Sequence, residues 1–125
     1  MGDLARERNL LPDRVLCSTA TRARETIEFF AQGAKLKAPV DFLDALYLAE
    51  PAAILREIRA HARSSERLMV LGHNPGLEGL LSILTGGRVE LVTTALAECI
   101  LRVERWSQLN LETAGTLRAL FHPGD

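Results

Sequence analysis

Short apolar runs alternate along the chain with longer stretches that have a helical repeat of apolar residues. The runs predict five strands, at residues 14–18, 40–43, 67–71, 97–106 and 116–121. The third is the clearest buried strand, because four consecutive apolar residues leave it no polar face. Turn residues bound most of these segments, which supports reading them as separate strands.

The helical repeat predicts helices over residues 1–9, 19–31, the stretch that follows Pro51, and residues 77–84. Gly33 is expected to end the second helix, and a pair of glycines follows the last. Alternating strands and helices favour a layered α/β fold; the resemblance described below implies a mixed sheet flanked by helices. The first element is a helix, whereas a parallel sheet usually begins with a strand.

The composition bounds the class of protein. The 125 residues, 47% of them hydrophobic, suit one domain over residues 1–125. The 15 basic residues nearly balance the 16 acidic ones, which argues against a nucleic-acid binder or a membrane-surface protein. No apolar run approaches the roughly 20 residues of a membrane span, and the start does not resemble a secretory signal. We therefore expect a cytoplasmic protein.

The two cysteines, Cys17 and Cys99, each lie in an apolar strand-like run. This context predicts small core residues, because neither a disulfide framework nor a metal site is indicated by their spacing. No other segment has the spacing of metal ligands or of a nucleotide-binding loop. We expect neither a metal nor a cofactor.

The first motif with possible chemistry is the junction between the strand at 14–18 and the helix after it. Ser18 ends the strand, and Arg22 lies in the first turn of the helix. The free N–H groups of a helix N-terminus attract anions, and the guanidinium of Arg22 reaches the same space. Arg24 points to the opposite side of the helix and is expected to face solvent. A capped helix with surface arginines remains the alternative.

The second motif is the junction after the strand at 67–71, where the chain reads Gly-His-Asn-Pro-Gly. His73 lies at the carboxyl end of the strand, Asn74 is a candidate helix cap, and Pro75 suits the first helical position. A histidine there can bind an oxyanion or transfer a proton. The alternative is a histidine that only hydrogen-bonds a turn. His61 and His122 are expected to be solvated.

Together the two junctions predict a phosphate site without a nucleophile. Ligands of open α/β sheets bind at the carboxyl ends of the strands, where both Arg22 and His73 are expected. Ser18 has no evident base and no surrounding nucleophile elbow. Cys17 is expected to be buried and therefore inert.

These motifs resemble the histidine phosphatase superfamily, in the branch of the SixA-like phosphohistidine phosphatases. Residues 15–26 resemble that superfamily's S-x-x-x-R-A-x-x-T segment, and residues 69–76 resemble the segment that carries its second catalytic histidine. Residues 46–51, 94–97 and 115–118 are also typical of this branch. The resemblance covers the whole chain in order.

The resemblance implies a three-layer phosphoglycerate-mutase-like fold and a phosphatase that acts on phosphohistidine or a small phosphoester. It implies that Arg22 binds the phosphate, that His73 stabilises the phosphoryl group, and that Ser18 and Asn74 lie beside the pocket. The expected partner is a phosphorylated protein or a small phosphorylated substrate, and no metal is needed. Asp44 and Glu50 are the nearest candidates for the general acid, which is variable in this branch.

The chain also departs from the family pattern. The nucleophile in this family is a histidine in an Arg-His pair at the end of the first strand, and the sequence contains no Arg-His pair. The family sheet has the order 3-2-4-1-5-6 with strand 5 antiparallel. Without strand 1, the strands at 67–71 and 97–106 are expected to lose their shared neighbour, which leaves two unpaired edges.

Three hypotheses remain open. The first is a SixA-like phosphatase read from a truncated frame, in which case an Arg-His motif would be encoded upstream of Met1. The second is a module that binds phosphate or a phosphopeptide without turnover. The third is a remnant that self-associates through its open sheet edges. For the chain as given, we expect little or no covalent catalysis.

Overall fold

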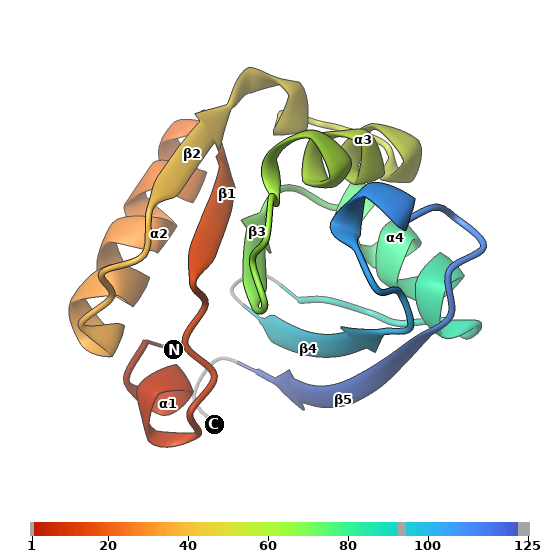
Figure 1. The fold of residues 1–125 in the computed structure, drawn as a ribbon. Coiled ribbons are helices and arrows are strands. Elements are labelled where there is room, and N and C mark those ends of the chain that lie inside the picture. The colour runs from red at the N-terminus through yellow and green to blue at the C-terminus, as the bar shows by residue number, and fades with distance from the viewer. Residues whose placement is uncertain (1, 93–94, 123–125) are drawn as a thin grey trace.

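A three-stranded parallel sheet lies at the centre of the structure (Figure 1). The computed structural model describes residues 2–92 and 95–122. Strand β1 (Arg14–Ser18) pairs with β2 (Val40–Leu43) on one side and with β3 (Leu68–Leu71) on the other. All three run in the same direction, so their carboxyl ends meet at one edge, which is where the two motifs were expected.

A second sheet consists of two antiparallel strands, β4 (Leu96–Leu101) and β5 (Gly115–Phe121), with a bulge between Glu98 and Cys99. Within the described residues, no ladder of hydrogen bonds joins this ribbon to the parallel sheet. Figure 1 shows that β4 lies between β3 and β5. The orders β2-β1-β3 and β4-β5 agree with the strand order that the resemblance implies, apart from its first strand, and the expected break between the sheets is present in the described residues.

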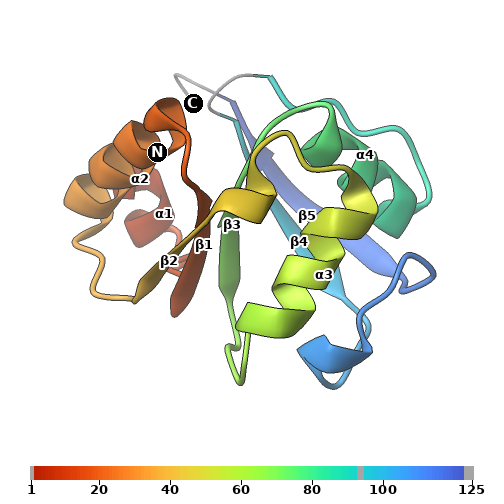
Figure 2. The ribbon, with the colours of Figure 1, turned by 90° about the horizontal axis from the view of Figure 1, so that it is seen from above.

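Helices cover both faces of the parallel sheet, which confirms the three-layer α/β fold. Figure 2 shows α1 and α2 on one side and α3 and α4 on the other. The helices are α1 (Gly2–Glu7), α2 (Thr21–Ala34), α3 (Pro51–His61) and α4 (Gly76–Thr85), with one-turn 3-10 helices η1 (Asp44–Leu46) and η2 (Trp106–Gln108). No helix in the described ranges has both the length and the apolar character needed to span a membrane.

The core consists of two apolar clusters, one on each face of the sheet. Successive residues of β1 point to opposite faces, so Leu16 joins one cluster while Val15 and Cys17 join the other. The first cluster lies under α3 and α4 and is built from Leu16, Leu46, Ile54, Leu55, Ile58, Ala62, Leu80, Leu84 and Leu109. The second lies under α1 and α2 and is built from Ala5, Val15, Cys17, Ala23, Ile27, Phe30, Ala34 and Leu71.

Gly33 does not end its helix, contrary to expectation. Helix α2 continues through Ala34, and Lys35 adopts the left-handed conformation that closes it. Gly33 and Gly2 lie where α1 packs on α2, and a Cβ on Gly2 would lie 2.2 Å from the carbonyl oxygen of Phe30. Both glycines therefore allow α1 and α2 to pack closely. This role of Gly33 depends on α1, a segment that is distant from it in the sequence.

The strand expected over residues 97–106 is shorter and ends at Leu101. The chain then turns, and Trp106 belongs to η2, where its indole N–H donates to the carbonyl of Ser65 at 2.5 Å. The indole of Trp106 is partly buried, and this hydrogen bond satisfies its N–H. This contact takes the end of the predicted strand out of the sheet and places it against the loop before β3.

Candidate functional site

The two motif junctions meet through a hydrogen bond between Ser18 and His73. Residues Cys17 and Leu71 are register partners in the parallel ladder, so the residues that follow them lie side by side at the carboxyl edge. The Oγ of Ser18 lies 2.8 Å from the Nε2 of His73, and it also accepts the N–H of Ala20 at 3.2 Å. Ser18 therefore fixes the imidazole of His73 against the start of α2.

This pairing corrects the expectation that Ser18 has no base. The hydrogen bond to His73 is of the kind that activates a serine nucleophile. Ser18 is, however, completely buried and does not border the cavity described below. Its hydroxyl therefore orients His73 and accepts the N–H of Ala20 just before α2, and it lacks the access that attack on a substrate requires.

Arg22 lies in the first turn of α2, is exposed to solvent, and borders the same cavity as His73. Across the described residues, its guanidinium makes no hydrogen bond or ion pair. The first turn of α2 also lacks an acidic residue. An uncommitted guanidinium beside a helix N-terminus is a suitable arrangement for binding an anion.

Arg24 differs from Arg22, as expected from the helical spacing. Its Nε donates to the carbonyl of Thr19 at 3.0 Å, and its guanidinium lies 4.5 Å from the centre of the Phe42 ring. These local contacts occupy Arg24 on the far side of α2. Of the two arginines, only Arg22 borders the cavity.

Asn74 acts as a helix cap, and its amide is fully engaged. Its Oδ1 accepts the N–H of Glu78 at 3.2 Å, while its Nδ2 donates to the carbonyl of Leu91 at 2.6 Å. The carboxylate of Glu78 in turn accepts the N–H of Leu91 at 2.7 Å. Asn74 thus joins α4 to the segment that leads into β4. A direct contact of Asn74 with substrate stays a prediction.

Tyr47 is a neighbour of His73 that sequence reasoning did not single out. The two ring centres are 5.3 Å apart and the rings meet edge to face at 72°. Tyr47 is 56% exposed and follows η1, and the next residue, Leu48, is 66% exposed with a left-handed φ of 51°. The sequence signal was its place in residues 46–51, which resemble the SixA-like branch, but no role was assigned to Tyr47 there.

The remaining candidates lie outside this arrangement. Asp44 and Glu50 are exposed and neither borders the cavity, so a general acid stays a prediction. His61 faces Glu57 at 3.7 Å on α3, and His122 is exposed, as expected, although it borders the cavity. The part of the chain that the structure describes contains no group of three or more residues placed to hold a metal.

Cys17 is buried, as expected. Burial raises the pKa of its thiol to about 11, because the thiolate loses its hydration, and the nearby charge of Arg24 opposes this only in part. Cys99, which was also expected in the core, is only partly buried and borders the cavity. The difference arises because β4 has a neighbouring strand on one side alone.

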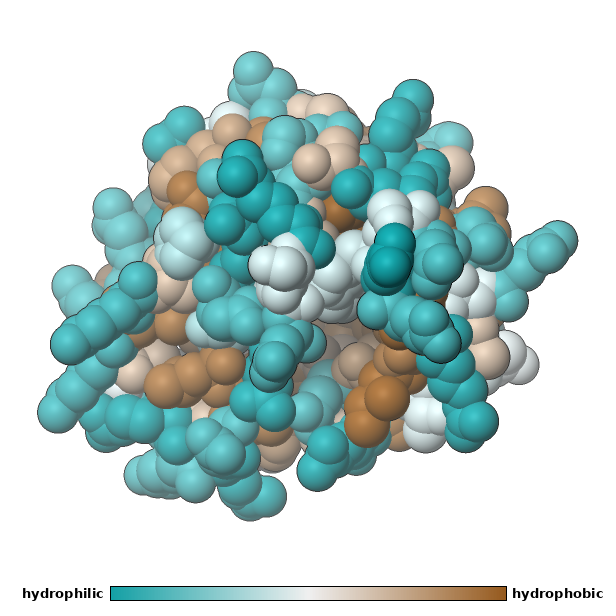
Figure 3. Space-filling view, viewed as in Figure 1, coloured by the Kyte–Doolittle hydropathy of each residue, from teal (hydrophilic) through white to brown (hydrophobic). Residues whose placement is uncertain are grey.

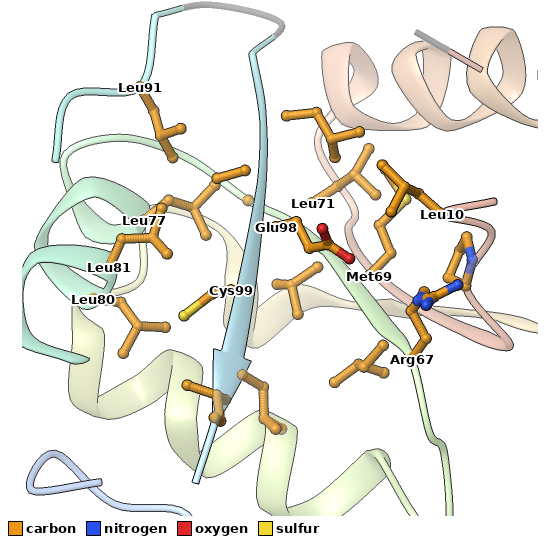
Figure 4. Close-up of a pocket in the computed structure, with 18 of the residues that line it drawn as sticks. Leu10, Arg67, Met69, Leu71, Leu77, Leu80, Leu81, Leu91, Glu98 and Cys99 are labelled. Atoms are coloured by element: carbon orange, nitrogen blue, oxygen red, sulfur yellow. The ribbon is translucent and has the colours of Figure 1, made fainter. Parts of the chain in front are cut away.

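A cavity of about 1580 Å³ separates β3 from β4, with Arg22 and His73 among the residues that border it. Figure 4 shows the leucines of α4 on one side of β4, and Leu10 and Met69 on the other. In the view of Figure 3, polar residues cover most of the surface and apolar residues are exposed in separate patches. The cavity therefore has both polar residues, Arg22 and His73 among them, and apolar residues along its walls.

Comparison with known sequences gives relatives of unknown activity. No family profile matches the sequence. An uncharacterized protein of Mycobacterium leprae is 32% identical over 111 residues, which are 82% of this chain and 66% of the relative. Uncharacterized proteins of Mycobacterium tuberculosis are 38% identical over 72 residues, or 58% of this chain and 43% of theirs. The chain thus spans only part of each curated relative.

Comparison with solved structures is more specific. A SixA-type phosphohistidine phosphatase from Nakamurella multipartitia superposes with a TM-score of 0.80 at 22% identity, over 99% of this chain and 78% of that one. A protein histidine phosphatase SixA complexed with tungstate gives a TM-score of 0.74 at 20% identity, over 98% and 76%. These two matches show the fold.

A third structure adds similarity in sequence. The SixA-type phosphohistidine phosphatase of Agrobacterium tumefaciens is 31% identical, with a TM-score of 0.61 over 66% of this chain and 53% of that one. The strand order, the helices on both faces and the two motif junctions agree with this assignment. The chain has the fold of the SixA-type phosphohistidine phosphatases and is similar in sequence to one of them.

Proposed function

We propose that this chain carries the phosphate-binding side of a phosphatase site, which acts on phosphohistidine in a protein or on a small phosphoester. One observation supports the proposal most. The uncommitted guanidinium of Arg22 and the imidazole of His73, which Ser18 holds, border one cavity at the carboxyl edge of the sheet. That edge is where α/β folds bind ligands.

The two side chains have complementary roles in this proposal. The planar guanidinium of Arg22 can donate to two phosphoryl oxygens at once. A ring N–H of His73 can stabilise the negative charge that grows on the oxygens as the phosphoryl group transfers. The free N–H groups at the start of α2 add to this positive potential. The solved relative that is complexed with tungstate, a phosphate-like oxyanion, supports such a site by analogy.

The test measures tungstate and phosphate binding to the purified chain by nuclear magnetic resonance titration. Loss of a charge-assisted contact of about 1.5–3 kcal/mol predicts that Arg22→Ala weakens binding roughly 10-fold to 150-fold. The matched control is Arg56→Ala, because Arg56 is exposed and outside the cavity. Equal weakening by both variants would show that only net charge matters and would refute the site.

A second candidate function is phosphate binding without turnover. One reason to favour it is that Ser18 and Cys17, the hydroxyl and the thiol at the end of the strand before Arg22, are both buried. The other is that the sequence contains no Arg-His pair. This candidate predicts oxyanion binding but no acid-labile phosphoenzyme after incubation with a phosphoramidate substrate. Hydrolysis that is abolished by His73→Gln and retained by His122→Gln would instead support a catalytic chain.

A further inference from the structure

We infer that Leu48, together with Tyr47, is a specificity-determining residue, which contacts the organic group that carries the phosphate and favours an aromatic group there. This inference rests on the proposed function, because it concerns the substrate of that same site. Three features support it: two large exposed side chains beside His73, a backbone conformation that leucine rarely adopts, and a turn that is fixed in place on both sides.

The two side chains project from a tight turn between η1 and α3. Tyr47 has a φ of −70° and a ψ of 118°, and Leu48 has a φ of 51°. The N–H of Ala49 donates to the carbonyl of Leu46 at 3.4 Å. These values are close to those of a type II turn, whose third residue has a positive φ and is usually glycine. Leucine thus occupies the position that glycine favours.

The leucine at this position has no evident benefit for stability. In the left-handed region, the Cβ of an L-residue lies too close to the following carbonyl oxygen. Leu48 is 66% exposed, so little apolar burial offsets this cost. The other non-glycine residues with a positive φ in the described ranges, Asn9, Lys35 and Arg63, are all polar. An exposed apolar side chain held in a strained conformation beside a site indicates a functional role.

The turn is fixed on both sides of the exposed pair. Leu46 is buried in the cluster under α3 and α4, and Ala49 packs against the same cluster. A Cβ on Gly76, the first residue of α4, would lie 2.0 Å from the carbonyl oxygen of Ala49. The turn therefore touches the start of the helix that follows His73. This contact gives the exposed pair a defined position relative to the imidazole.

The turn lies beside the proposed anion site. The rings of Tyr47 and His73 meet edge to face, with their centres 5.3 Å apart. Leu48 borders the same cavity as Arg22 and His73. In Figure 1 the connection that contains the turn runs from β2 to α3 above β1 and β3, whose carboxyl ends lead to Arg22 and His73.

This position determines which part of a substrate the turn meets. A phosphoryl group held by Arg22 and His73 has its organic substituent bonded directly to phosphorus, so the substituent begins next to the imidazole. An aromatic substituent would pack against the ring of Tyr47 and bury apolar surface on Leu48. A methyl group or a polyol gains less, because it offers less apolar surface and no ring.

The experiment measures the dissociation constants of phenylphosphonate and methylphosphonate by nuclear magnetic resonance titration of the full chain. Both probes carry the same anionic group on a stable P–C bond, so the ratio of their affinities isolates the organic substituent. We expect phenylphosphonate to bind about 10-fold more tightly. Leu48→Gly should reduce this preference to about 2-fold to 3-fold and leave tungstate binding unchanged. It should not lower the unfolding temperature, because glycine suits the turn.

Two variants serve as controls. Leu48→Met keeps an apolar side chain at the turn and should keep the preference for phenylphosphonate. Lys35→Gly places glycine at another exposed residue with a positive φ, one that does not border the cavity. It should leave the preference unchanged, which separates loss of the Leu48 side chain from relief of backbone strain in general.

Three results would overturn the inference. One is equal affinity of the unaltered chain for both phosphonates alongside tungstate binding that depends on Arg22, which would leave the proposed function in place. Another is a preference for phenylphosphonate that Leu48→Gly retains. The third is a lower unfolding temperature and weaker tungstate binding in Leu48→Gly, which would assign the leucine a structural role. Absence of tungstate binding in the unaltered chain would instead refute the proposed function, and this inference with it.

Discussion

The parallel sheet and the antiparallel ribbon bury their strands to very different extents. Strand β1 has a neighbour on each side and helices over each face, and its residues Val15 to Ser18 are fully buried. No residue of β4 is fully buried, and its Ile100 is 47% exposed. We call the parallel sheet and the helices that cover it the parallel half. The residues that contact His73, which are Ser18 and Tyr47, and the helix that carries Arg22 all belong to the parallel half. The contacts of His73 with Ser18 and Tyr47 therefore do not involve the ribbon.

The same contrast predicts two levels of stability within one chain. Apolar burial is the main favourable contribution to folding, so the ribbon, which buries less, should open at lower free energy than the parallel half. The following experiments test that difference, beginning with the largest expected effect.

The largest effect is expected from truncation of a buried leucine in the parallel half. Leu16→Ala removes a side chain with no solvent exposure from the cluster under α3 and α4, and should cost about 2–5 kcal/mol in the free energy of unfolding. Ile100→Ala in the ribbon should cost less than about 1 kcal/mol, because Ile100 is half exposed. Urea denaturation followed by circular dichroism measures both, and equal losses would contradict the comparison.

A smaller effect is expected from methyl groups added at two glycines. Gly76→Ala would place a Cβ 2.0 Å from the carbonyl oxygen of Ala49, so the turn that carries Tyr47 must move. Such overpacking costs about 1–3 kcal/mol. Gly87→Ala, in the connection towards the ribbon, meets no atom within 4 Å and should change stability by less than about 0.5 kcal/mol. Thermal unfolding of the pair checks the prediction, and a tolerated Gly76→Ala would show that the turn is loosely held.

Replacement of Tyr47 tests whether the parallel half contains the complete anion site. An aromatic pair contributes about 0.5–1.5 kcal/mol, so loss of the contact with His73 in Tyr47→Leu should weaken tungstate binding roughly 2-fold to 10-fold. Tyr47→Phe keeps the ring and should bind like the unaltered chain. The ribbon variant Ile100→Ala should also bind normally, and a weakened affinity there would mean that the ribbon contributes to the site.

The smallest effect concerns the two cysteines, one in each half. A thiol reacts as the thiolate, so Cys17, which is buried with a pKa near 11, should resist alkylation at pH 8 until the chain unfolds. Burial also raises the pKa of Cys99, with partial opposition from the N–H of Thr116, but this thiol is partly exposed. It should react first, as peptide mass spectrometry after iodoacetamide treatment would show. Faster labelling of Cys17 would contradict the assigned burial.

The raised pKa of Cys17 also has a consequence for stability. The folded chain keeps this proton above the pH at which the unfolded chain loses it, near 9.0. The unfolded state therefore binds fewer protons in that window, and stability should fall as the pH rises from about 9 to about 11. The variant Cys17→Ala should flatten this dependence when denaturation is measured across the same range.

Features that depend on neighbouring residues were predictable from the sequence. Four consecutive apolar residues identified β3, and the change of period after Ser18 identified the start of α2. The break between β3 and β4 was also predictable, because the resemblance supplied a strand order that the chain could be compared with. The positions of the strands and helices follow from the periodicity of apolar residues, and the break follows from the order of the motifs along the chain.

Features that depend on distant contacts were not predictable. The hydrogen bond between Ser18 and His73 joins residues 55 positions apart, so no local sequence pattern predicts it. The end of β4 is determined by the contact of Trp106 with Ser65, and the role of Gly33 by its packing on α1. Tyr47 became a candidate only when its ring was found beside His73. In each case the deciding partner is brought in by the fold.

The hydrogen bonds at Leu91 have a mechanical consequence. Both backbone groups of this residue are bound by side chains near the start of α4. Its carbonyl accepts from Asn74, two residues before the helix, and its N–H donates to Glu78 in the first turn. The segment that enters the ribbon is therefore anchored one residue from His73. A displacement of this segment would be transmitted to the residue beside the imidazole, so the half of the molecule that buries less apolar surface is linked directly to the proposed site.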